Sequence, residues 1–550
     1  MQLKTILLSA TLMISPLTLA TTAAAQAIPG VKNVIVIIND GAGPTVYDAT
    51  RMYLGKPLVT DGAAFKKIHV STYPLREDRF PTSVYSTEPT FVGGVLQDNN
   101  QPLTTRQQEA VVYTSARFWD TTPVTGRVLT APGNPSGTIA GGSFATGYQS
   151  YPAGFAGYEY SRFAHPDSGN TASSLATGNR SYNNSINVDG AGVPQVAITD
   201  VIDAAKAVGK TTGVVSTVSF GDATPAALGG AHNVMRSNRL AIAAEMFSSG
   251  KLDVIGGAGN PDFDDNGALR TTPSYTWVSA AQWADLKNGT NTTGTNAAKW
   301  KLLQDKLEID ALADKKVKPP VRVAMIMKGD NSTQYNRSGA STNPTLHEPF
   351  VPGTTLPACF PAPATPVPCA QPLKTNVPTQ VKLTVAALNV LGSQGRGFYL
   401  MSEAGAVDRA EHGNSTGRMI EEQIDSDNTV QAVIDWVNRA DTAATWDNTL
   451  LIVTADHDHL LYGPDGATVP FQPLVDKGPG KVPGNRWFGP NHGTGLVPLY
   501  AYGKGSDAIA ALATLNDTYT DAEGRTFGNG AYTEQTVLGQ VLKDTLGQAN

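Results

Sequence analysis

Cysteine, charge and long apolar runs are all scarce in this chain of 550 residues. Only 2 residues are cysteine and 8 are histidine, which argues against a zinc-finger or iron–sulfur protein. These counts leave room for a metal site built from carboxylates and a few histidines. Charged residues make up 16%, and 41 Lys and Arg against 47 Asp and Glu give a formal net charge of −6. This mildly acidic balance, without a long basic run, argues against nucleic acid as the main partner.

The chain is instead rich in apolar residues and in loop-forming residues. Hydrophobic residues make up 41%, which is enough for a large core and excludes a disordered protein. The 55 glycines and 36 prolines indicate many loops, although their share is far below that of a collagen-like chain.

The N-terminal residues have the pattern of a secretory signal peptide. Lys4 precedes a short apolar run over residues 6–20 that is interrupted by Pro16, and small residues follow over 23–27. We therefore expect residues 1–27 to be a signal peptide and the rest of the chain to be exported, either periplasmic or secreted. The alternative, a membrane anchor, is weaker because the run is short and contains proline. No later stretch is apolar enough to span a bilayer, so we expect no membrane partner.

Export would place the two cysteines in an oxidising compartment. Cys359 and Cys369 lie in a proline-rich stretch without a helix or strand pattern. A close pair of this kind predicts a local disulfide. The alternative, two free thiols that bind a metal, lacks a third soft ligand nearby.

Six short runs are continuously apolar rather than alternating, which is typical of buried parallel strands. They cover residues 34–38, 213–216, 321–327, 397–401, 450–453 and 496–502. Helical patterns lie between them, over 200–208 and over 424–437. This alternation predicts an α/β fold with a central, mostly parallel sheet that is covered by helices on both faces. In such sheets the functional residues lie at the carboxyl ends of the strands.

Three regions interrupt the α/β pattern. They lie at about 74–160, 261–318 and 333–379 and resemble surface excursions, the first being rich in Gly, Thr, Tyr and Pro. We interpret them as insertions in a single catalytic domain over residues 28–550, although the length also fits two domains.

Carboxylates and histidines follow two of the early and middle strands. Asp40 ends the first strand before a glycine turn that exposes its carboxylate, although alone it fits an ordinary turn aspartate equally well. Glu403, Asp408 and His412 follow the strand over 397–401. The i, i+4 spacing of Asp408 and His412 lets one helical turn point both at a single cation. The alternative is a solvated acidic loop with a surface histidine.

A similar group follows the strand over 450–453. Asp456 and His457 come directly after it, and His459 lies two positions further on. His492 lies between glycines before the last predicted strand. An adjacent carboxylate and imidazole at a strand end suit zinc, and several such groups in one chain favour a metal centre.

Ser168 is the candidate nucleophile. The small residues that follow it, through Ser174, would let a helix N-terminus approach an anion closely. For this segment alone the simpler interpretation is a Ser/Thr-rich helix cap without chemistry.

Taken in order, these segments resemble the alkaline phosphatase family from about residue 32 to the C-terminus. The matching motifs are Asn39-Asp40-Gly41, Asp167-Ser168-Gly169-Asn170-Thr171-Ala172, the FGDATPAALGGAHNVMR segment, Glu403 with Asp408 and His412, Thr454 to His457, and His492. The resemblance implies the family's fold and its metal-dependent site.

The resemblance also implies two zinc ions, one magnesium ion and a phosphoserine intermediate on Ser168. The implied ligands of the first zinc are Asp408, His412 and His492. Those of the second zinc are Asp40, Ser168, Asp456 and His457. Those of magnesium are Asp40, Thr224 and Glu403, with Asp222 in or near its outer shell.

Arg236 is implied as the residue that grips two oxygens of the phosphate, because its planar guanidinium suits that geometry. The interval from Asp222 to Arg236 is one residue longer than is usual in the family, so Arg239 stays a minor alternative. Arg409 would add positive charge near the phosphate. His232 is expected to pack structurally, and His459 to lie at the rim or behind a ligand.

The resemblance implies an exported enzyme that hydrolyses phosphate monoesters and releases inorganic phosphate. Relatives that act on diesters or phosphonates are the first alternative, and Arg236 with the magnesium ligands favours monoesters. A sulfatase is disfavoured because the nearest motif, which begins at Cys359, lacks its arginine. A non-catalytic metal- or phosphate-binding relative would lack a nucleophile or a ligand, and none is missing. The oligomeric state stays open, a homodimer included.

Overall fold

The computed structural model describes residues 26–75, 91–92, 95–96, 112–123, 154–188, 197–290, 299–337 and 373–549. Nearly all of the predicted signal peptide (residues 1–25) and the Cys359–Cys369 pair lie outside the described residues. Most of the predicted insertions at 74–160 and 333–379 lie outside them as well. These predictions therefore stay predictions.

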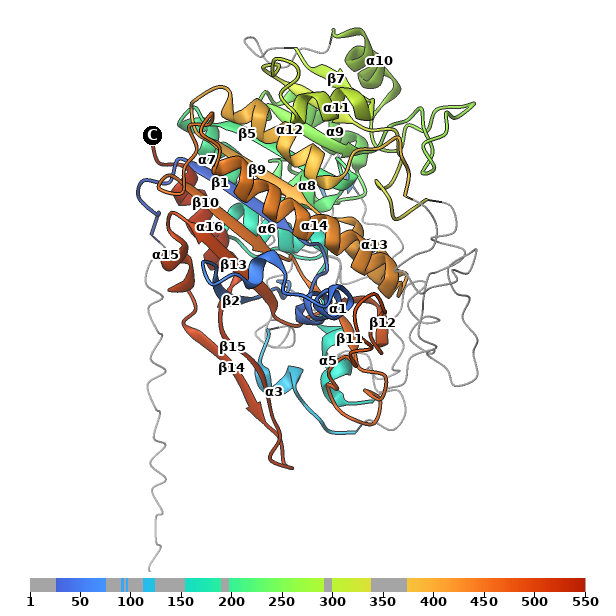
Figure 1. Cartoon of the computed structure of the whole chain (residues 1–550), viewed down its shortest axis with the longest axis vertical. Coiled ribbons are helices and arrows are strands. Elements are labelled where there is room, and N and C mark those ends of the chain that lie inside the picture. The colour runs from blue at the N-terminus through green and yellow to red at the C-terminus, as the bar shows by residue number, and fades with distance from the viewer. Residues whose placement is uncertain are drawn as a thin grey trace, which may run out of the picture.

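An 11-stranded sheet forms the centre of the protein (Figure 1). In order across the sheet its strands are β14 (Leu515–Thr520), β15 (Thr526–Glu534), β2 (Lys66–Ser71), β13 (Val497–Gly503), β10 (Thr449–Thr454), β1 (Asn33–Ile38), β9 (Phe398–Glu403), β5 (Thr211–Ser219), β6 (Val254–Ala258), β8 (Val323–Ile326) and β7 (Lys301–Leu303). Two small ribbons pair β11 (Asp458–Tyr462) with β12 (Arg486–Gly493), and β3 (Phe91–Val92) with β4 (Val95–Leu96).

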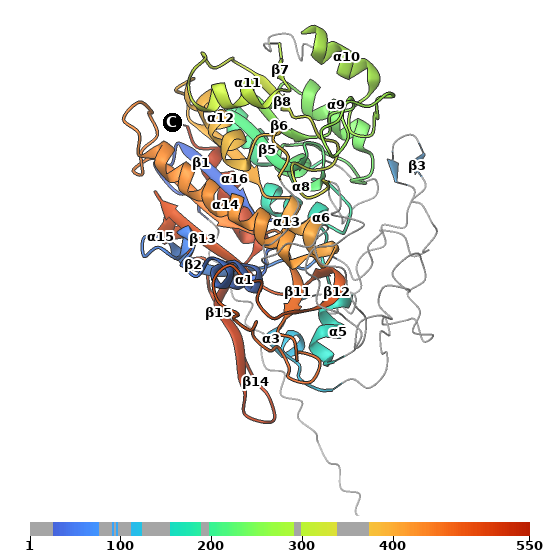
Figure 2. The same cartoon turned by 45° about the vertical axis from the view of Figure 1, so that its right-hand side comes forward.

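Helices cover both faces of this sheet (Figure 1, Figure 2). One layer contains α11 (Lys306–Ala313), α12 (Gln380–Gly392), α14 (Thr416–Val437) and α1 (Pro44–Leu54). The other contains α6 (Ser168–Thr177), α7 (Val201–Ala207), α8 (Ala223–Leu228) and α16 (Gln535–Leu546). The remaining helices are η1 (Val59–Asp61), α3 (Ser115–Phe118), α5 (Ala156–Phe163), α9 (Arg239–Ser248), α10 (Ala280–Asn288), α13 (Ala406–His412) and α15 (Ser506–Ala510). In the part of the chain that the structure describes, no helix combines the length and the apolar character needed to cross a membrane.

The predicted parallel core is confirmed. β1 pairs in parallel with both β10 and β9, and β5 pairs in parallel with β9 and β6. Every residue of β1, β5, β9 and β10 is buried, which explains why these strands are continuously apolar or small. Their carboxyl ends meet at one edge of the sheet, where Asp40 and Glu403 lie.

The direction of the last predicted strand is a correction. The run over 496–502 was expected among the parallel strands, but β13 runs antiparallel to both β10 and β2. Most of β13 is buried, and burial on both faces produces a continuous apolar run in either direction. The hydrophobic pattern therefore identified the strand but not its orientation.

Two other elements differ from the sequence-based expectation. The segment 261–318, predicted as a surface excursion, contains β7, which extends the main sheet beside β8, and α11, which packs on α12. These elements are too short to show a clear period. Helix α14 begins at Thr416, eight residues before the predicted start. The apolar pattern did not reveal its first turns, because they bury polar side chains such as Arg418 and Glu422.

Candidate active site

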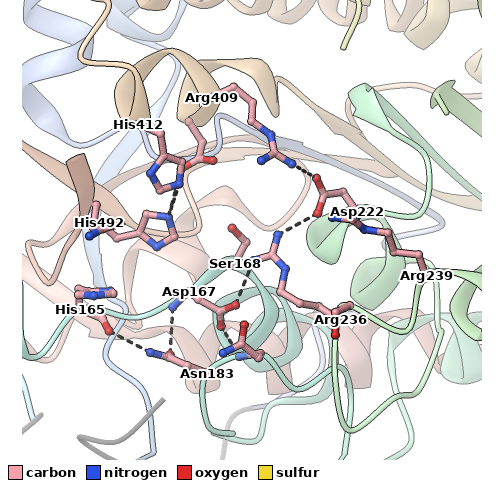
Figure 3. A pocket seen from close by; sticks show the side chains of 14 residues that line it. His165, Asp167, Ser168, Asn183, Asp222, Arg236, Arg239, Arg409, His412 and His492 are labelled. Carbon is pink, nitrogen blue, oxygen red and sulfur yellow. Dashed lines mark hydrogen bonds and ion pairs between the residues drawn. The ribbon is translucent and has the colours of Figure 1, made fainter. Parts of the chain in front are cut away.

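A cavity of about 390 Å³ lies beside the carboxyl ends of β5 and β9 (Figure 3). Six of the residues that the sequence predicted for the site line it: Ser168, Asp222, Arg236, Asp408, His412 and His492. The other five predicted residues are buried: Asp40, Thr224, Glu403, Asp456 and His457. The remaining lining residues are His165, Asp167, Asn183, Asn184, Ser237, Arg239, Arg409 and Asn491.

Ser168 is the first residue of α6, so its hydroxyl lies at a helix N-terminus. The N-cap is Asp167, whose carboxylate accepts a hydrogen bond from the Asn170 backbone at 3.1 Å, while the Asn170 side chain accepts one from the Asp167 backbone at 2.9 Å. The helix dipole favours negative charge at this point. Ser168 Oγ lies 3.2 Å from His457 Nε2, which places the candidate nucleophile against the candidate metal ligands.

Three buried carboxylates converge behind Ser168. We call Asp40, Glu403 and Asp456 the carboxylate cluster. Burial and the neighbouring charges of Asp456 and Asp408 raise the pKa of Asp40 well above its ordinary value. Burial also raises the pKa of Asp456, and it raises that of Glu403 to about 8. His457 Nε2 lies 3.3 Å from Asp40 Oδ1 and 3.4 Å from Asp456 Oδ2. Such a concentration of negative groups is costly unless a cation or protons compensate it.

Unpartnered polar atoms mark the same place. Asp40 Oδ1, Glu403 Oε1, Thr224 Oγ1 and His457 Nδ1 are buried and make no hydrogen bond to another described residue. The second Glu403 oxygen accepts a hydrogen bond from Ser216. Oxygen donors of this kind suit a hard cation such as Mg²⁺. The chain next to Asp40 is tightly packed and requires glycine. Gly41 has φ +81°, and a Cβ there would collide with the side chain of Glu411.

Asp408, His412, His459 and His492 form a second group, which we call the histidine cluster. One ligand atom from each lies within 4.8 Å of those of the others. His412 Nδ1 faces the Pro490 carbonyl at 2.7 Å and His492 Nδ1 faces the Pro166 carbonyl at 2.8 Å. If each Nδ1–H donates to its carbonyl, the two Nε2 lone pairs face each other at 3.1 Å. Asp408 Oδ1 lies 3.3 Å from His412 Nε2 and 3.2 Å from His492 Nε2. Two imidazole lone pairs and a carboxylate oxygen converging in this way match the ligands that zinc prefers.

His459 is the one member of this cluster that is not among the residues lining the cavity, and it lies next to Glu411. His459 Nε2 lies 2.9 Å from Asp408 Oδ1 and 3.6 Å from Glu411 Oε2. Burial lowers the pKa of His459 to about 3 and raises that of Glu411 well above its ordinary value. Glu411 was not among the predicted site residues, although its position three residues after Asp408 predicts the same helical face.

We call Asp167, Asp222, Arg236 and Arg409 the arginine cluster (Figure 3). Arg236 Nη1 binds Asp167 Oδ2 at 3.0 Å, and its Nη2 binds Asp222 Oδ1 at 2.8 Å. Arg409 pairs with the other Asp222 oxygen. Burial opposes the charge on Asp222, but Arg409 and Arg236 hold its pKa below the ordinary value. Asp222 therefore faces two guanidinium groups, while its predicted place in or near the magnesium shell stays a prediction.

The structure places Arg236 and its minor alternative Arg239 differently, while the phosphate-binding role of Arg236 stays a prediction. The Arg236 side chain points into the cavity, whereas Arg239 lies on the far side of Asp222 from the histidines and stacks on Trp277 at 4.3 Å (Figure 3). Other residues that line the cavity were not predicted from the sequence. Asn183 Oδ1 accepts the Asp167 backbone N–H at 3.0 Å, and its Nδ2 donates to the His165 carbonyl at 3.2 Å. No spacing rule marks such residues, because the fold brings them to the cavity from separate loops.

Comparison with known proteins supports a single family. A family model described as Alkaline phosphatase matches residues 157–472, more than half of the chain. Alkaline phosphatase of Escherichia coli strain K12 is 26% identical over 302 residues, which cover 53% of this chain and 58% of that protein. Alkaline phosphatase H of Pseudomonas aeruginosa is 26% identical over 368 residues, which cover 64% and 71%. The chain therefore spans less than two thirds of the Escherichia coli relative.

Solved structures share the fold over nearly the whole chain. Alkaline phosphatase of Thermus thermophilus superposes with a TM-score of 0.54 at 16% identity, covering 98% of this chain and 96% of that one. Alkaline phosphatase from the Antarctic bacterium TAB5 gives 0.50 at 17% identity, covering 94% and 98%. At these identities the likeness concerns the fold.

Proposed function

The chain belongs to the alkaline phosphatase family, and from this we propose that it hydrolyses phosphate monoesters through a phosphoserine on Ser168. One observation carries the proposal. The Ser168 hydroxyl lies at a helix N-terminus in a cavity that Arg236 and the candidate zinc ligands Asp408, His412 and His492 also line, and the buried carboxylate cluster lies behind it. This is the set of groups that phosphoryl transfer requires: a nucleophile, a positively charged clamp and cation ligands.

We propose that the enzyme holds two zinc ions and one magnesium ion. The residues fit this assignment. The histidine cluster offers imidazole nitrogens and a carboxylate oxygen as metal ligands, and the carboxylate cluster contains buried oxygens that make no hydrogen bond to another described residue. Asp408, His412 and His492 would hold one zinc, and Asp40, Asp456, His457 and Ser168 the other. Thr224, Glu403 and Asp40 would hold magnesium, with Asp222 in or near its outer shell. Bound divalent cations would lower the pKa of the Ser168 hydroxyl and stabilise negative charge on the leaving oxygen.

The protein groups define the two steps. Ser168 Oγ loses its proton to solvent and attacks phosphorus, the bond to the leaving oxygen breaks, and the leaving alkoxide takes a proton from solvent. Water then attacks the phosphoserine, which releases inorganic phosphate and returns a proton to Ser168. Asp167 and Asp222 hold the guanidinium group of Arg236 through its Nη1 and Nη2 atoms, and its remaining N–H groups would grip two non-bridging oxygens. Pre-alignment of this kind stabilises charge without reorganisation during the reaction.

The test compares purified wild-type protein with Ser168→Ala on a phosphate monoester, after loading with zinc and magnesium. Ser174→Ala is the matched control, because Ser174 is buried in the same helix and its hydroxyl bonds only to the Asn170 carbonyl at 2.9 Å. We expect Ser168→Ala to lose nearly all turnover and Ser174→Ala to retain it. Full turnover in Ser168→Ala would exclude the proposed nucleophile, and an inactive wild type would exclude the activity.

We also propose that the protein is exported after removal of residues 1–27. The basis is the sequence pattern alone. N-terminal sequencing of the mature protein from the periplasm or the medium tests it, and a mature chain that retains Lys4 in the cytoplasm would contradict it.

A further inference from the structure

The loop between α8 and α9 carries Arg236 and is tied to the rest of the protein at His232. The His232 backbone N–H donates to Glu245 Oε2 at 2.7 Å, and ring atom Nδ1 lies 2.9 Å from Glu245 Oε1. On the other side, Nε2 lies 3.1 Å from the Ile198 carbonyl and 3.4 Å from Asp200 Oδ2. The imidazole therefore joins α9 to the segment that leads into α7.

Both ring nitrogens of His232 face oxygen atoms that can only accept. A neutral imidazole has a single N–H, so it can donate to one side only, whereas an imidazolium donates to both. Asp200 Oδ2 is fully buried and makes no hydrogen bond to another described residue. Burial and the charge of Asp203 raise the pKa of Asp200 to about 6, so above that pH a carboxylate lies 3.4 Å from the ring. The contacts thus fit a protonated His232.

The surrounding charges favour the same state. Glu245 in α9, Asp200 at the N-cap of α7 and Asp203 in its first turn are acidic, and the nearby cation Lys251 pairs with Asp203 at 2.5 Å. Burial alone would lower the pKa of His232, but the hydrogen bond to Glu245 and the charge of Asp200 raise it above the ordinary value. The ring therefore keeps its proton to a higher pH than an exposed histidine does.

The tied loop leads directly to Arg236. Asn233 pairs with Ile186 through two backbone hydrogen bonds of 2.9 and 2.8 Å, and the Arg236 N–H donates to the Asn184 carbonyl at 2.7 Å. The loop is thus held from one side by the strand-like segment near Asn184 and from the other by His232. Movement on the His232 side would tilt the guanidinium that Asp167 and Asp222 align.

We propose that His232 is a positioning residue: as an imidazolium it clamps the Arg236 loop between Glu245 and Asp200 and thereby sets the affinity of the site for the phosphate dianion. The proposal rests on the proposed function of the cavity. The direction of the pH dependence follows from the number of N–H groups on the His232 ring. As the pH rises and the ring loses one proton, one of the two ties is lost, the Arg236 loop loosens and phosphate affinity falls.

The experiment measures the inhibition constant of inorganic phosphate against pH, on metal-loaded enzyme, together with kcat and KM. The variants are His232→Gln, which cannot titrate, and Glu245→Gln, which keeps the imidazole but removes its carboxylate partner. His69→Gln is the control, since His69 is a partly buried histidine of β2 outside the cavity. The ¹⁵N or ¹³C shifts of the His232 ring, assigned with His232→Gln, report its protonation without any activity.

We expect His232→Gln to weaken phosphate binding about three- to tenfold at the acidic end of the range, a typical effect of losing a charge-assisted contact, with kcat changed less than KM. The plot of its phosphate inhibition constant against pH should lack one titration step that the wild type shows. Glu245→Gln should move that step to lower pH by about one unit, and the ring titration should move with it. His69→Gln should match the wild type.

Three results of the phosphate and ring measurements would overturn the proposal. They are identical phosphate profiles in the wild type and His232→Gln, a step that Glu245→Gln leaves in place, and a His232 ring that is neutral throughout. Loss of one bound metal ion in His232→Gln would instead assign Asp200, Asp203 and His232 to a cation site and would also overturn it. If the wild type neither turns over monoesters nor binds phosphate, the proposed function fails, while the ring titration still decides whether His232 is charged.

Discussion

The histidine cluster and the arginine cluster lie on opposite sides of Ser168 and differ in how their charges are balanced (Figure 3). In the arginine cluster each carboxylate oxygen has a partner. Asp222 pairs with two arginines, and Asp167 binds Arg236 and the backbone N–H groups of Asn170 and Asn184. In the histidine cluster the ring nitrogens of His412 and His492 face one another. In the carboxylate cluster, Asp40 Oδ1 and Glu403 Oε1 make no hydrogen bond to another described residue.

The difference shows which part of the site the folded chain forms by itself and which part needs bound cations. The arginine cluster is assembled by folding, so its phosphate-binding geometry should exist without metal. The histidine and carboxylate clusters concentrate negative charge and lone pairs, which become favourable only with cations or protons present. The two sides should therefore respond differently to chelation, substitution and pH.

Chelation should have the largest effect and should act on one side only. We expect removal of divalent ions to abolish monoester hydrolysis, and zinc plus magnesium to restore it, because the donor atoms lose the charge that makes their arrangement catalytic. Thermal unfolding should shift to lower temperature, since ions that bind only the folded state stabilise it. Full activity after exhaustive chelation, with no metal found by elemental analysis, would contradict the comparison.

Substitution of Arg236 tests the other side. Arg236→Ala should lower monoester kcat/KM by about 10²–10³, the usual cost of losing a preorganised donor, while the metal content stays unchanged. Hydrolysis of a diester should suffer less, because one of the gripped oxygens is then esterified. Arg239→Ala is the control and should do little to a simple monoester. A larger defect in Arg239→Ala than in Arg236→Ala would reverse our assignment of the clamp.

Arg409 should matter less than Arg236. Its guanidinium shares Asp222 but is not fixed by Asp167, and about a third of its side chain is exposed. We expect Arg409→Ala to reduce monoester kcat/KM about three- to tenfold, in line with the loss of one charged contact near the surface. A defect as large as that of Arg236→Ala would mean that Arg409 grips the phosphate directly.

The pH dependence of stability should be the subtlest difference, and its sign should differ between the two sides. The folded pKa of Glu403 is raised from 4.5 to about 8, so the metal-free folded state binds more protons than the unfolded state between these values. Its stability should therefore fall as the pH rises through this window, by at most about 1.4 kcal/mol per pH unit for one proton. The pKa of Asp222 is lowered, so its contribution is present above the ordinary value of 3.8 and is lost in acid.

Urea unfolding of the metal-free protein from pH 5 to 8 measures the first contribution, with Glu403→Gln as the reference. The slope should be shallower in Glu403→Gln, and metal loading should make the two slopes equal. A common slope should remain, because burial also raises the pKa of Glu422 to about 8 in both proteins. An identical slope in the wild type and Glu403→Gln would show that Glu403 is not protonated in the metal-free site.

The strands and helices that carry the site residues could be predicted from the sequence, whereas the contacts between their side chains could not. Continuous apolar runs located β1, β9 and β10, and the strand-end rule then placed Asp40 and Glu403 together at one edge. The i, i+4 spacing of Asp408 and His412 predicted a helical turn, and α13 contains both residues. These inferences work because each depends on local period and on the geometry of parallel strands.

The arrangement of partners could not be predicted in the same way. Asp167, Asn183 and Arg236 come from separate loops, and their contacts depend on how α6 and α8 pack. The direction of β13 was missed because burial does not encode it, and Glu411 was missed because buried carboxylates are rare. Tertiary packing decides these features, so a single sequence carries little information about them.

The most direct test of the central account is to trap the phosphorylated enzyme. Metal-loaded protein is incubated with labelled phosphate at low pH, quenched and mapped by peptide mass spectrometry. The account predicts one phosphoryl group on Ser168, and none in Ser168→Ala. A label on Thr171, whose hydroxyl instead donates to Asp456 at 3.1 Å, or an enzyme that turns over substrate without any trapped phosphoserine, would contradict it.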